Sequence, residues 1–531
     1  GAEAPSGGSQ GTEDDTAEAE ALEEIVVASA ALPTSFAPDG GGAGVLENIT
    51  WRRNGGAGLV RNVYVPEDDG SFDQDSYEYE GYLAESWDVS EDGKVYTFHL
   101  REGVMSVNGN EFDADDVLWS YERKFNTATS IVKSISFPII TDLSQIQKVD
   151  KYTVSFTLEQ PGHGFTLLGL LGQGMANMYD SDYLKANATP ADPYAVEFSK
   201  TNANYGYGPY VVESFTPGQE MVWRSNPDHA LGEPAIKKIT FRVVTDPASR
   251  ANALRTGDVD VAEVLRPADQ VDLSGSGAAK SFTFETNAYA LATLVSTHPP
   301  FDDVDVRRAF TYAVPYQQII DDVYRGRALP AVGFLNPRAP GYTDDGLPRY
   351  EYDPDKAKEM LEEAGHPDGV SFTLTVSNAL SDIQEVAVAI QSYAKDAGFD
   401  IEIQELPGAA FTEGVNNKTF DATLNRSASV TLSPAYELNL YFRAGSTTNG
   451  SGWESQEYYD AMAVGTSLPD PLSDEAGEAW NAVQKIYMDE VPMIFMARIQ
   501  PLNAFANNVD GYANRSDNVI DFSMLTATVA D

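Results

Sequence analysis

The pattern of hydrophobic and polar residues predicts short strands and amphipathic helices that alternate along most of the chain. Glu24–Ala30 is a β-branched run that predicts a buried strand. Trp87–Val89 and Val95–Leu100 flank an Asp-Gly pair, which is a strong signal for a β-hairpin. Asp113 precedes Ala114–Asp116 and a stretch with helical apolar periodicity, which predicts a helix with Asp113 as its N-cap.

The same alternation continues through the rest of the chain. Apolar runs predict strands at Val154–Leu158, Tyr210–Val212, Met221–Trp223, Ile239–Val244, Phe372–Val376 and Ile401–Gln404. Helical periodicity predicts helices at Pro247–Leu254, Asp305–Tyr324, Pro354–Leu361, Ile383–Ala397 and Leu472–Met488. Strands that alternate with helices of this length favour α/β lobes with mostly parallel sheets.

The first segment, residues 1–24, differs from the rest in composition. It is rich in Gly, Ala, Ser, Glu and Asp, it has no aromatic residue, and no Lys or Arg occurs before Arg52. Such a segment cannot bury enough apolar surface to offset the entropy of ordering it. We therefore expect a disordered acidic leader or tether here, with any signal peptide absent or already removed.

Composition narrows the possible functions. The chain has 531 residues, 81 acidic and 35 basic side chains, a net charge of −46 and no cysteine. This length predicts roughly three domain-sized units. The acidic excess disfavours binding to nucleic acid or to an anionic membrane surface. The lack of cysteine excludes disulfide frameworks, iron–sulfur clusters and thiol nucleophiles.

Catalytic motifs are not found. The sequence contains no HExxH, GxSxG, Walker or GxGxxG motif, and its histidines are far apart: His99, His163, His229, His298 and His366. We expect no enzyme activity, no catalytic residue, no metal and no cofactor. A hydrolase that uses two carboxylates is a less favoured alternative, and no sequence motif identifies a particular pair of acids for that role.

One acidic segment has the spacing of a calcium-binding loop. Asp69, Ser71, Asp73 and Asp75 occupy alternate positions and Glu80 follows, but Gln74 stands where such a loop needs glycine. A solvated surface loop is therefore the favoured interpretation.

Several blocks of sequence follow one another in a recognisable order. Three of them are close together, at Leu83–Gly93, Tyr96–Val104 and Phe112–Val117. Later blocks lie at Gly206–Tyr210, Arg224–Asp228, Ala253–Asp260, Val306–Phe310, Tyr352–Lys358 and Gly450–Trp453. Together they closely resemble family 5 of the extracellular solute-binding proteins, the oligopeptide- and dipeptide-binding receptors of ABC importers.

The resemblance implies an α/β fold: a periplasmic-binding-protein-like clamp of two lobes with mixed sheets. The larger N-terminal lobe would carry an inserted subdomain. The implied divisions are a leader at 1–24, lobe I at 25–289 with the subdomain around 65–205, lobe II at 290–499, and a return to lobe I at 500–531. The crossings between lobes would lie near Glu285–Leu294 and Met496–Asn503.

The function that the resemblance implies is capture of a peptide or related small solute between the lobes and delivery to ABC permease subunits. The protein would be a monomer outside the cytoplasm, in the periplasm or as a cell-surface lipoprotein whose signal peptide and anchoring cysteine have been removed. Two alternatives share the fold. One is a receptor for an oligosaccharide or an opine-like sugar conjugate, and the other is a solute sensor that signals through a partner.

Ligand contacts in this family come largely from three segments, which the resemblance places at 33–36, 173–177 and 425–430. The residues carried over or added for their chemistry are Thr34, Ser35, Phe36, Met175, Asn177, Tyr207, Asn425, Arg426, Ser427, Ser429, Tyr436 and Trp453. Each could instead be ordinary loop or core, and Trp453 could simply cap the core of lobe II.

One departure from the family matters for the ligand. Peptide receptors of this family typically place an aspartate a few residues before a proline, where it pairs with the α-ammonium of the ligand. Here the proline is Pro434, the matching position is Val430 or Thr431, and no acid stands between Asp421 and Glu437. Because a buried ammonium needs a carboxylate, either another acid takes the role or the ligand has no free amine.

Overall fold

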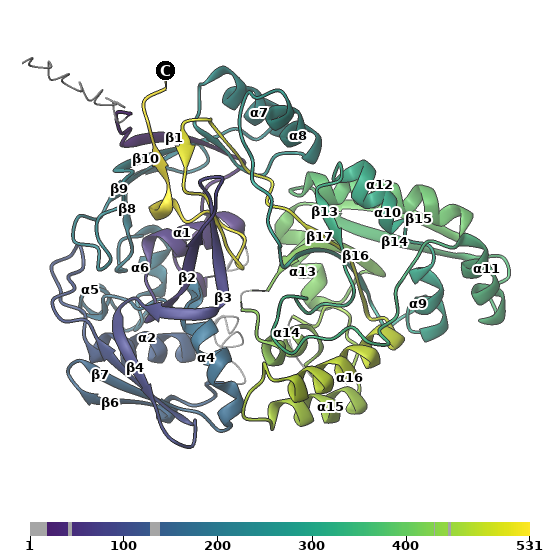
Figure 1. Ribbon diagram of the computed structural model, residues 1–531, viewed down its shortest axis with the longest axis horizontal. Coiled ribbons are helices and arrows are strands. Elements are labelled where there is room, and N and C mark those ends of the chain that lie inside the picture. Colours follow the sequence, from purple (N-terminus) through teal and green to yellow (C-terminus); the bar gives the residue numbers. More distant parts are fainter. Residues whose placement is uncertain (1–18, 41–44, 128–138, 430, 444–447, 531) are drawn as a thin grey trace, which may run out of the picture.

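The chain folds into two bodies built on separate β-sheets, which Figure 1 shows side by side. They are described here from a computed structural model, which covers residues 19–40, 45–127, 139–429, 431–443 and 448–530. The first body, lobe I, contains β1–β11, β18–β21 and the helices up to α8; the second, lobe II, contains β12–β17 and α9–α16.

The main sheet of lobe I has six strands. Their spatial order is β18 (Ala504–Phe505), β11 (Val261–Ala262), β1 (Glu24–Ser29), β10 (Lys238–Val243), β9 (Glu220–Ser225) and β8 (Tyr210–Thr216). The predicted first strand is confirmed as β1, which pairs in parallel with β10 on one side and β11 on the other. Ile25 and Val27 point to the same face of this central strand and are almost fully buried in the hydrophobic core of lobe I.

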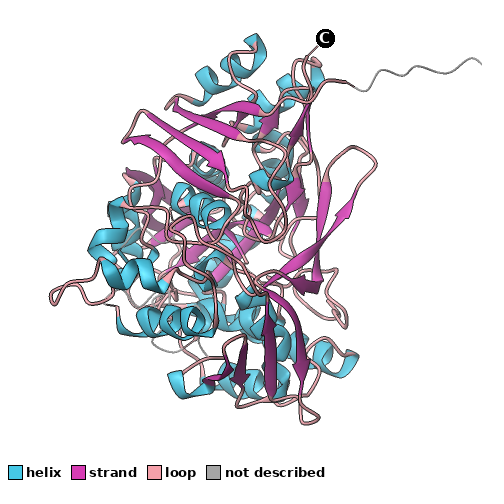
Figure 2. Cartoon of the chain, turned by 90° about the vertical axis from the view of Figure 1, so that its left-hand side faces the viewer, coloured by secondary structure: helices cyan, strands magenta, loops and turns pink. Residues whose placement is uncertain are grey.

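Lobe I also carries smaller sheets. Figure 2 faces this lobe and shows that its strands point in several different directions. An antiparallel sheet has the order β4 (Ala84–Val89), β5 (Val95–Leu100), β7 (Thr153–Thr157) and β6 (Ile146–Asp150). Two more sheets contain β2 (Val60–Pro66), β3 (Phe72–Gly81) and β20 (Ala513–Asn514), and β19 (Val509–Asp510) with β21 (Thr526–Ala527). The predicted Asp-Gly hairpin is confirmed as β4–β5.

The sheet of lobe II also has six strands. Their order is β13 (Ala328–Pro330), β17 (Met493–Ile499), β12 (Ala288–Leu294), β16 (Ala422–Ala428), β14 (Val370–Ser377) and β15 (Phe399–Leu406). Phe301, Phe310, Phe372 and Phe399 contact one another edge-on or tilted beneath it, with ring centroids 4.8 to 6.2 Å apart. These aromatic contacts fix how the helices pack on the sheet.

The helices cover these sheets. In lobe I they are α1 (Leu46–Gly55), α2 (Ala114–Asn126), α4 (Gly164–Leu171), α5 (Ser181–Ala186), α6 (Val196–Thr201), α7 (Pro247–Thr256) and α8 (Pro267–Gly275). In lobe II they are α9 (Val304–Thr311), α10 (Tyr316–Gln318), α11 (Pro354–Glu363), α12 (Ser381–Asp396), α13 (Gly408–Asn417), α14 (Pro434–Phe442), α15 (Gln456–Thr466) and α16 (Asp474–Glu490). The predicted cap of α2 is confirmed, since the Asp113 side chain accepts a hydrogen bond from the Asp115 backbone N–H.

The prediction of mostly parallel sheets is wrong, because antiparallel pairs dominate both lobes. Parallel pairing joins β1 with β10 and β11, β14 with β15 and β16, and β20 with β3, while the other strand pairs described are antiparallel. Short turns such as the one between β8 and β9 can join only antiparallel strands. In lobe II the chain enters along β12 and leaves along β17, so this pair also runs antiparallel.

The single long helix predicted for Asp305–Tyr324 is also wrong. α9 ends at Thr311, and the chain resumes as α10 at Tyr316 and then as a π-helical turn at Ile319–Val323. Pro315 lies at the break. Proline has no N–H to donate and disfavours helical backbone in the residue before it, so apolar periodicity alone could not continue the helix.

The last residues of the segment 1–24, predicted as a disordered leader, are ordered. Ala21 forms an antiparallel bridge with Thr528, and the Leu22 backbone N–H donates to the Ala527 carbonyl at 2.8 Å. The last residues of the predicted leader therefore pair with the end of the chain. Residues 1–18 lie outside the described residues.

Two chain segments connect the lobes, one just before β12 and one just after β17. They are tied to each other by Gln500, whose side-chain amide accepts from the Phe284 backbone N–H at 2.8 Å and donates to the Phe284 carbonyl at 2.7 Å. This paired hydrogen bond keeps the two connections side by side, where a rotation of one lobe against the other would be concentrated.

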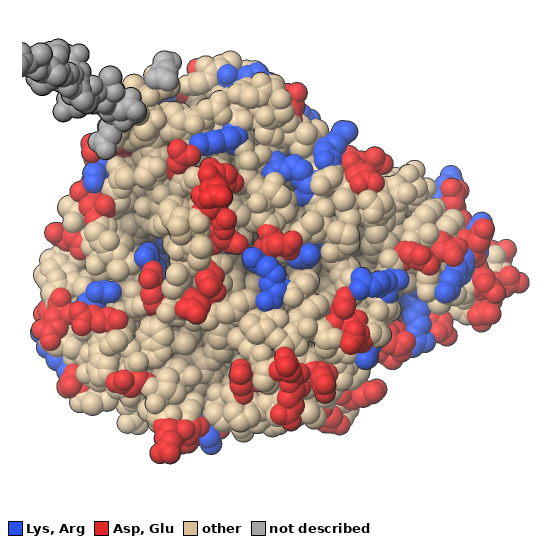
Figure 3. All heavy atoms as spheres, viewed as in Figure 1, with Lys and Arg blue, Asp and Glu red and all other residues tan. Residues whose placement is uncertain are grey.

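Charge is spread over the surface of both lobes. On the face in Figure 3, groups of Asp and Glu side chains are scattered over both bodies, with groups of Lys and Arg among them. The acids of the calcium-like segment lie in and beside the β2–β3 hairpin and have separate partners: Asp73 pairs with Arg338 and Glu80 with Arg61. Within the described residues, no helix has the length and apolar character needed to span a bilayer.

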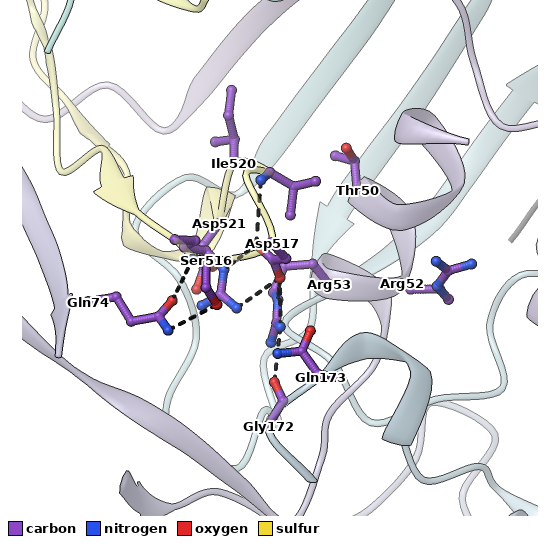
Figure 4. Close-up of polar contacts among 12 residues, drawn as sticks. Thr50, Arg52, Arg53, Gln74, Gly172, Gln173, Ser516, Asp517, Ile520 and Asp521 are labelled. Atoms are coloured by element: carbon purple, nitrogen blue, oxygen red, sulfur yellow. Dashed lines mark hydrogen bonds and ion pairs between the residues drawn. The ribbon is translucent and has the colours of Figure 1, made fainter. Parts of the chain in front are cut away.

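A buried ionic cluster holds the returning C-terminal segment against lobe I (Figure 4). Asp517 accepts from Arg53 on α1 at 2.8 Å and from Arg515 at 2.9 Å, and Arg53 also donates to the Gly172 carbonyl at 3.0 Å. Burial alone would raise the pKa of Asp517, but the two guanidinium groups hold it well below its usual range. The carboxylate therefore stabilises the fold above the pKa of an ordinary aspartate, and this contribution is lost as the pH falls below it.

Replacing Asp517 by alanine should lower the free energy of unfolding by about 3–5 kcal/mol, because two buried arginines lose their partner. Urea denaturation at neutral pH measures this. Glu197→Ala, which removes an exposed pair with Lys200, is the control and should change the free energy by less than about 0.5 kcal/mol. Equal midpoints for the Asp517 variant and the wild type would contradict this account.

Candidate functional site

The two lobes meet where α4 of lobe I faces the start of α14 in lobe II. The Thr166 hydroxyl on α4 and the Ser433 hydroxyl just before α14 are 2.5 Å apart. A Cβ added at Gly169 would lie 2.0 Å from the Thr431 hydroxyl oxygen, so the lobes approach this closely only because residue 169 is glycine. We call the region formed by β3, α4, residues 429 and 431–433, and α14 the junction.

α14 packs on both lobes. Tyr436 and Leu440, four residues apart, lie on one side of the helix and join the hydrophobic cluster of lobe I. Leu438 and Phe442 lie on the other side and pack in lobe II. The helix therefore closes the space between the lobes in this structure, and Glu437 stands between its two apolar sides.

Glu437 is a buried acid that has no hydrogen-bond or ion-pair partner among the described residues. Its exposed fraction is 0%, and among the described residues neither carboxyl oxygen has a hydrogen-bond partner. Burial raises its pKa well above the usual value, and the neighbouring Ser429 hydroxyl opposes this without meeting hydrogen-bond geometry. The neutral acid is therefore the favoured form at this site.

The electrostatic influence of Glu437 reaches tyrosines of both lobes. Burial, and then the charge of Glu437, raise the pKa values of Tyr77 on β3 and Tyr289 on β12. Tyr441 has its pKa raised to about 12, chiefly by burial. Tyr77 stacks on Phe165 of α4 with a centroid distance of 5.8 Å, and its hydroxyl has no partner in the described part of the chain. The junction thus combines aromatic rings with one unpaired acid.

The basic residues near the junction are already paired. Arg338 contacts Asp73 of lobe I at 3.2 Å and the Glu285 carbonyl at 3.1 Å. Arg498 contacts the Glu285 carboxylate at 2.9 Å. Because several of these side chains are partly exposed, each pair stabilises the closed arrangement by no more than about 1 kcal/mol.

The predicted residues after β1 lie in lobe I. The Thr34 backbone N–H donates to the Asn48 side chain at 3.1 Å, and the Ser35 hydroxyl accepts from the Ala37 backbone N–H at 3.1 Å. Phe36 is buried against Trp51 and Phe215. Phe36 is therefore part of the core.

The second predicted group is also tied to the structure of lobe I. Asn177 donates its side-chain amide to the Arg52 carbonyl at 2.7 Å, and the Tyr207 hydroxyl lies 3.3 Å from the Asp116 carboxylate. Met175, two residues before Asn177 in the sequence, is half-buried. Asn177 and Phe36 line one cavity of about 20 Å³, which has room for about one water molecule. A second cavity, beside Pro434, has about 10 Å³, so neither holds a peptide while the lobes are closed.

The third predicted group lies on or near lobe II. Arg426 on β16 pairs with the buried Asp382 at 2.5 Å, Asn425 accepts from the Arg426 backbone N–H at 2.8 Å, and the Ser427 hydroxyl bonds to that of Tyr441. The Ser429 carbonyl accepts from Asn287 at 2.8 Å. Val430 lies outside the described residues.

Of the predicted site residues, the structure brings Ser427, Ser429 and Tyr436 to the junction and leaves Trp453 elsewhere. Trp453 is 6% exposed and packs edge-on against Phe442 and Tyr458, in the core of lobe II. A ligand role for these residues stays a prediction. Tyr77, Tyr289 and Glu437 were not predicted, because they come from β3, β12 and α14, which are distant in the sequence.

Comparisons with known proteins agree on one family. Residues 78–449 match the family described as bacterial extracellular solute-binding proteins, family 5 Middle. The di/tripeptide-binding protein 3 of Pseudomonas aeruginosa is 32% identical over 312 residues, 55% of this chain and 56% of that protein. A dipeptide-binding protein of P. aeruginosa is 27% identical over 456 residues, 81% of this chain and 83% of that protein.

A solved structure shows the same fold. It is the ABC transporter-associated periplasmic binding protein DppA of Helicobacter pylori in complex with the peptide STSA. The TM-score is 0.83 at 24% identity, and the match covers 96% of this chain and 99% of that one. The predicted α/β clamp with mixed sheets is confirmed by this likeness and by the two mixed six-stranded sheets.

Replacing Trp453 by alanine should lower the free energy of unfolding by about 3–5 kcal/mol, because it empties a packed core position. Urea denaturation measures the loss, and Val464→Ala, at a 58% exposed position on α15, is the control. A Trp453 variant that is as stable as the wild type but no longer binds solute would show instead that this residue contacts the ligand.

Proposed function

The chain belongs to family 5 of the bacterial extracellular solute-binding proteins, and on that premise we propose that it is the receptor of an ABC importer for peptides. The relatives named for di- and tripeptides support peptide over saccharide or opine as the solute. The partners would be the permease subunits of the importer. A monomeric receptor held outside the cytoplasm, in the periplasm or by a lipid anchor, completes the proposal.

The observation that carries the proposal is the contact between two lobes across the junction. Lobe I (25–289) and lobe II (290–499), with the return at 500–531, would move as rigid bodies about the two tied connections. Solute would enter while α4 and α14 are apart and would be enclosed when α14 packs on lobe I. The solute would be released unchanged, since this mechanism makes and breaks no bond.

Mass spectrometry of the purified protein under native conditions should detect a bound peptide. In a thermal-shift screen of di- and tripeptides, those that bind should raise the melting temperature of the protein. A ligand at 100 times its Kd stabilises the folded state by about 2.7 kcal/mol. Oligosaccharides and opine-type conjugates serve as the comparison set. Stabilisation by these compounds and by no peptide would overturn the proposal.

Gly169→Ala should weaken peptide binding at least tenfold, about 1.4 kcal/mol. The added methyl group would clash with Thr431 only when the lobes are closed. Within α4 itself the substitution is favourable, because alanine has a higher helix propensity than glycine. Isothermal titration calorimetry measures the affinity.

The matched control for this variant is Gly172→Ala at the end of the same helix, where an added Cβ has its nearest neighbour at 3.6 Å. Its affinity should stay within twofold of the wild type. Equal affinities for the two alanine variants would contradict closure through this contact.

A further inference from the structure

We propose that Arg338 and Asp73 form a latch between the lobes, which slows the opening of the clamp and therefore the release of the solute. The inference rests on the proposed function, and it concerns the control of release and not the chemistry of the solute. Asp73 belongs to the acidic segment whose spacing is that of a calcium-binding loop, and its cationic partner comes from the other lobe.

Arg338 lies in a strap, which we define as residues 331–343 of lobe II. The strap follows β13 and consists of turns and extended chain, with no helix or strand between these two residue numbers. A segment of this kind has no regular backbone pairing of its own, so the contacts of its side chains and its ends determine where it lies.

The first part of the strap is fixed in the core of lobe II. The Gln484 side-chain oxygen on α16 accepts from the backbone N–H groups of Phe334 and Leu335 at 3.0 and 3.3 Å. The Tyr289 hydroxyl on β12 donates to the Phe334 carbonyl at 2.7 Å. The Phe334 ring is buried and stacks on Phe495 of β17 with a centroid distance of 4.6 Å.

The last part of the strap is fixed to the same helix. Asn481 on α16 donates its side-chain amide to the Thr343 carbonyl at 2.9 Å. Gly341 has a left-handed backbone, and a Cβ added there would lie 2.3 Å from the carbonyl oxygen of Ser473, the N-cap of α16. Both parts of the strap therefore move with lobe II, and Arg338 lies between them.

The guanidinium of Arg338 leaves lobe II and contacts lobe I. One of its nitrogens lies 3.2 Å from the Asp73 carboxylate on β3, and another donates to the Glu285 carbonyl at 3.1 Å, in the first connection between the lobes. Asn514 on β20 donates to the other oxygen of Asp73 at 2.8 Å and so orients the carboxylate. A single side chain of lobe II thus contacts both lobe I and a connection.

The latch is weak, because solvent screens it. The side chains of Arg338 and Asp73 are 40% and 20% exposed, and ion pairs of this kind change an equilibrium only severalfold. The two residues belong to different lobes, so opening separates them. The contact should therefore slow the dissociation of an enclosed solute and have little effect on its association, which starts from the open state.

The test measures release of the peptide that gives the largest thermal shift, by stopped-flow fluorescence with the intact chain. Arg338→Gln and Asp73→Asn should each raise the dissociation rate about three- to fivefold and change the association rate less than about twofold. The double variant should release no faster than either single variant, because both substitutions remove one contact. Added NaCl should speed release from the wild type and reduce its difference from Arg338→Gln.

Arg349→Gln is the matched control, since Arg349 pairs with Asp344 of the same lobe at 2.5 Å. Its dissociation rate should stay within about 1.5-fold of the wild type. Circular dichroism should show that all the variants are folded.

Two results would overturn the latch and leave the peptide receptor standing. One is equal dissociation rates for Arg338→Gln and Arg349→Gln, and the other is a double variant whose effect is the product of the two single effects. If the wild type binds no peptide, the proposed function itself fails. The same set of variants is then measured with the solute that mass spectrometry finds bound, so that the latch is tested separately.

Discussion

The packing of α14 on both lobes is the interaction on which the closed structure depends. Because residues two apart on a helix face opposite ways, Tyr436 and Leu438 contact different cores. Each side buries apolar surface, so closure has a hydrophobic driving force that does not depend on the weak surface ion pairs. Gly169 and the Thr166–Ser433 contact set how near the lobes come.

The same helix brings an unpaired acid into the interior. Elsewhere the buried acids have partners: Asp517 lies between two arginines, and Asp382 has Arg426. In the part of the chain that the structure describes, Glu437 has no such partner, and its burial therefore costs stability in the closed structure.

Much of the fold could be predicted from local signals. The Asp-Gly turn before Val95–Leu100 and the cap at Asp113 act within a few residues, and the structure has both. The helix break at Pro315 was missed because apolar periodicity continues past it. The role of Trp453 and the position of Glu437 depend on contacts between distant segments, which one sequence does not reveal. The family resemblance located the lobes but not this acid.

The most direct test of the central claim is the distance between the lobes with and without solute. The chain has no cysteine, so Val149→Cys on β6 and Val464→Cys on α15, at positions 61% and 58% exposed, can carry a donor and an acceptor dye. Energy transfer should increase when a peptide that raises the melting temperature is added. Unchanged transfer with every such peptide would contradict the account of a clamp that closes on its solute.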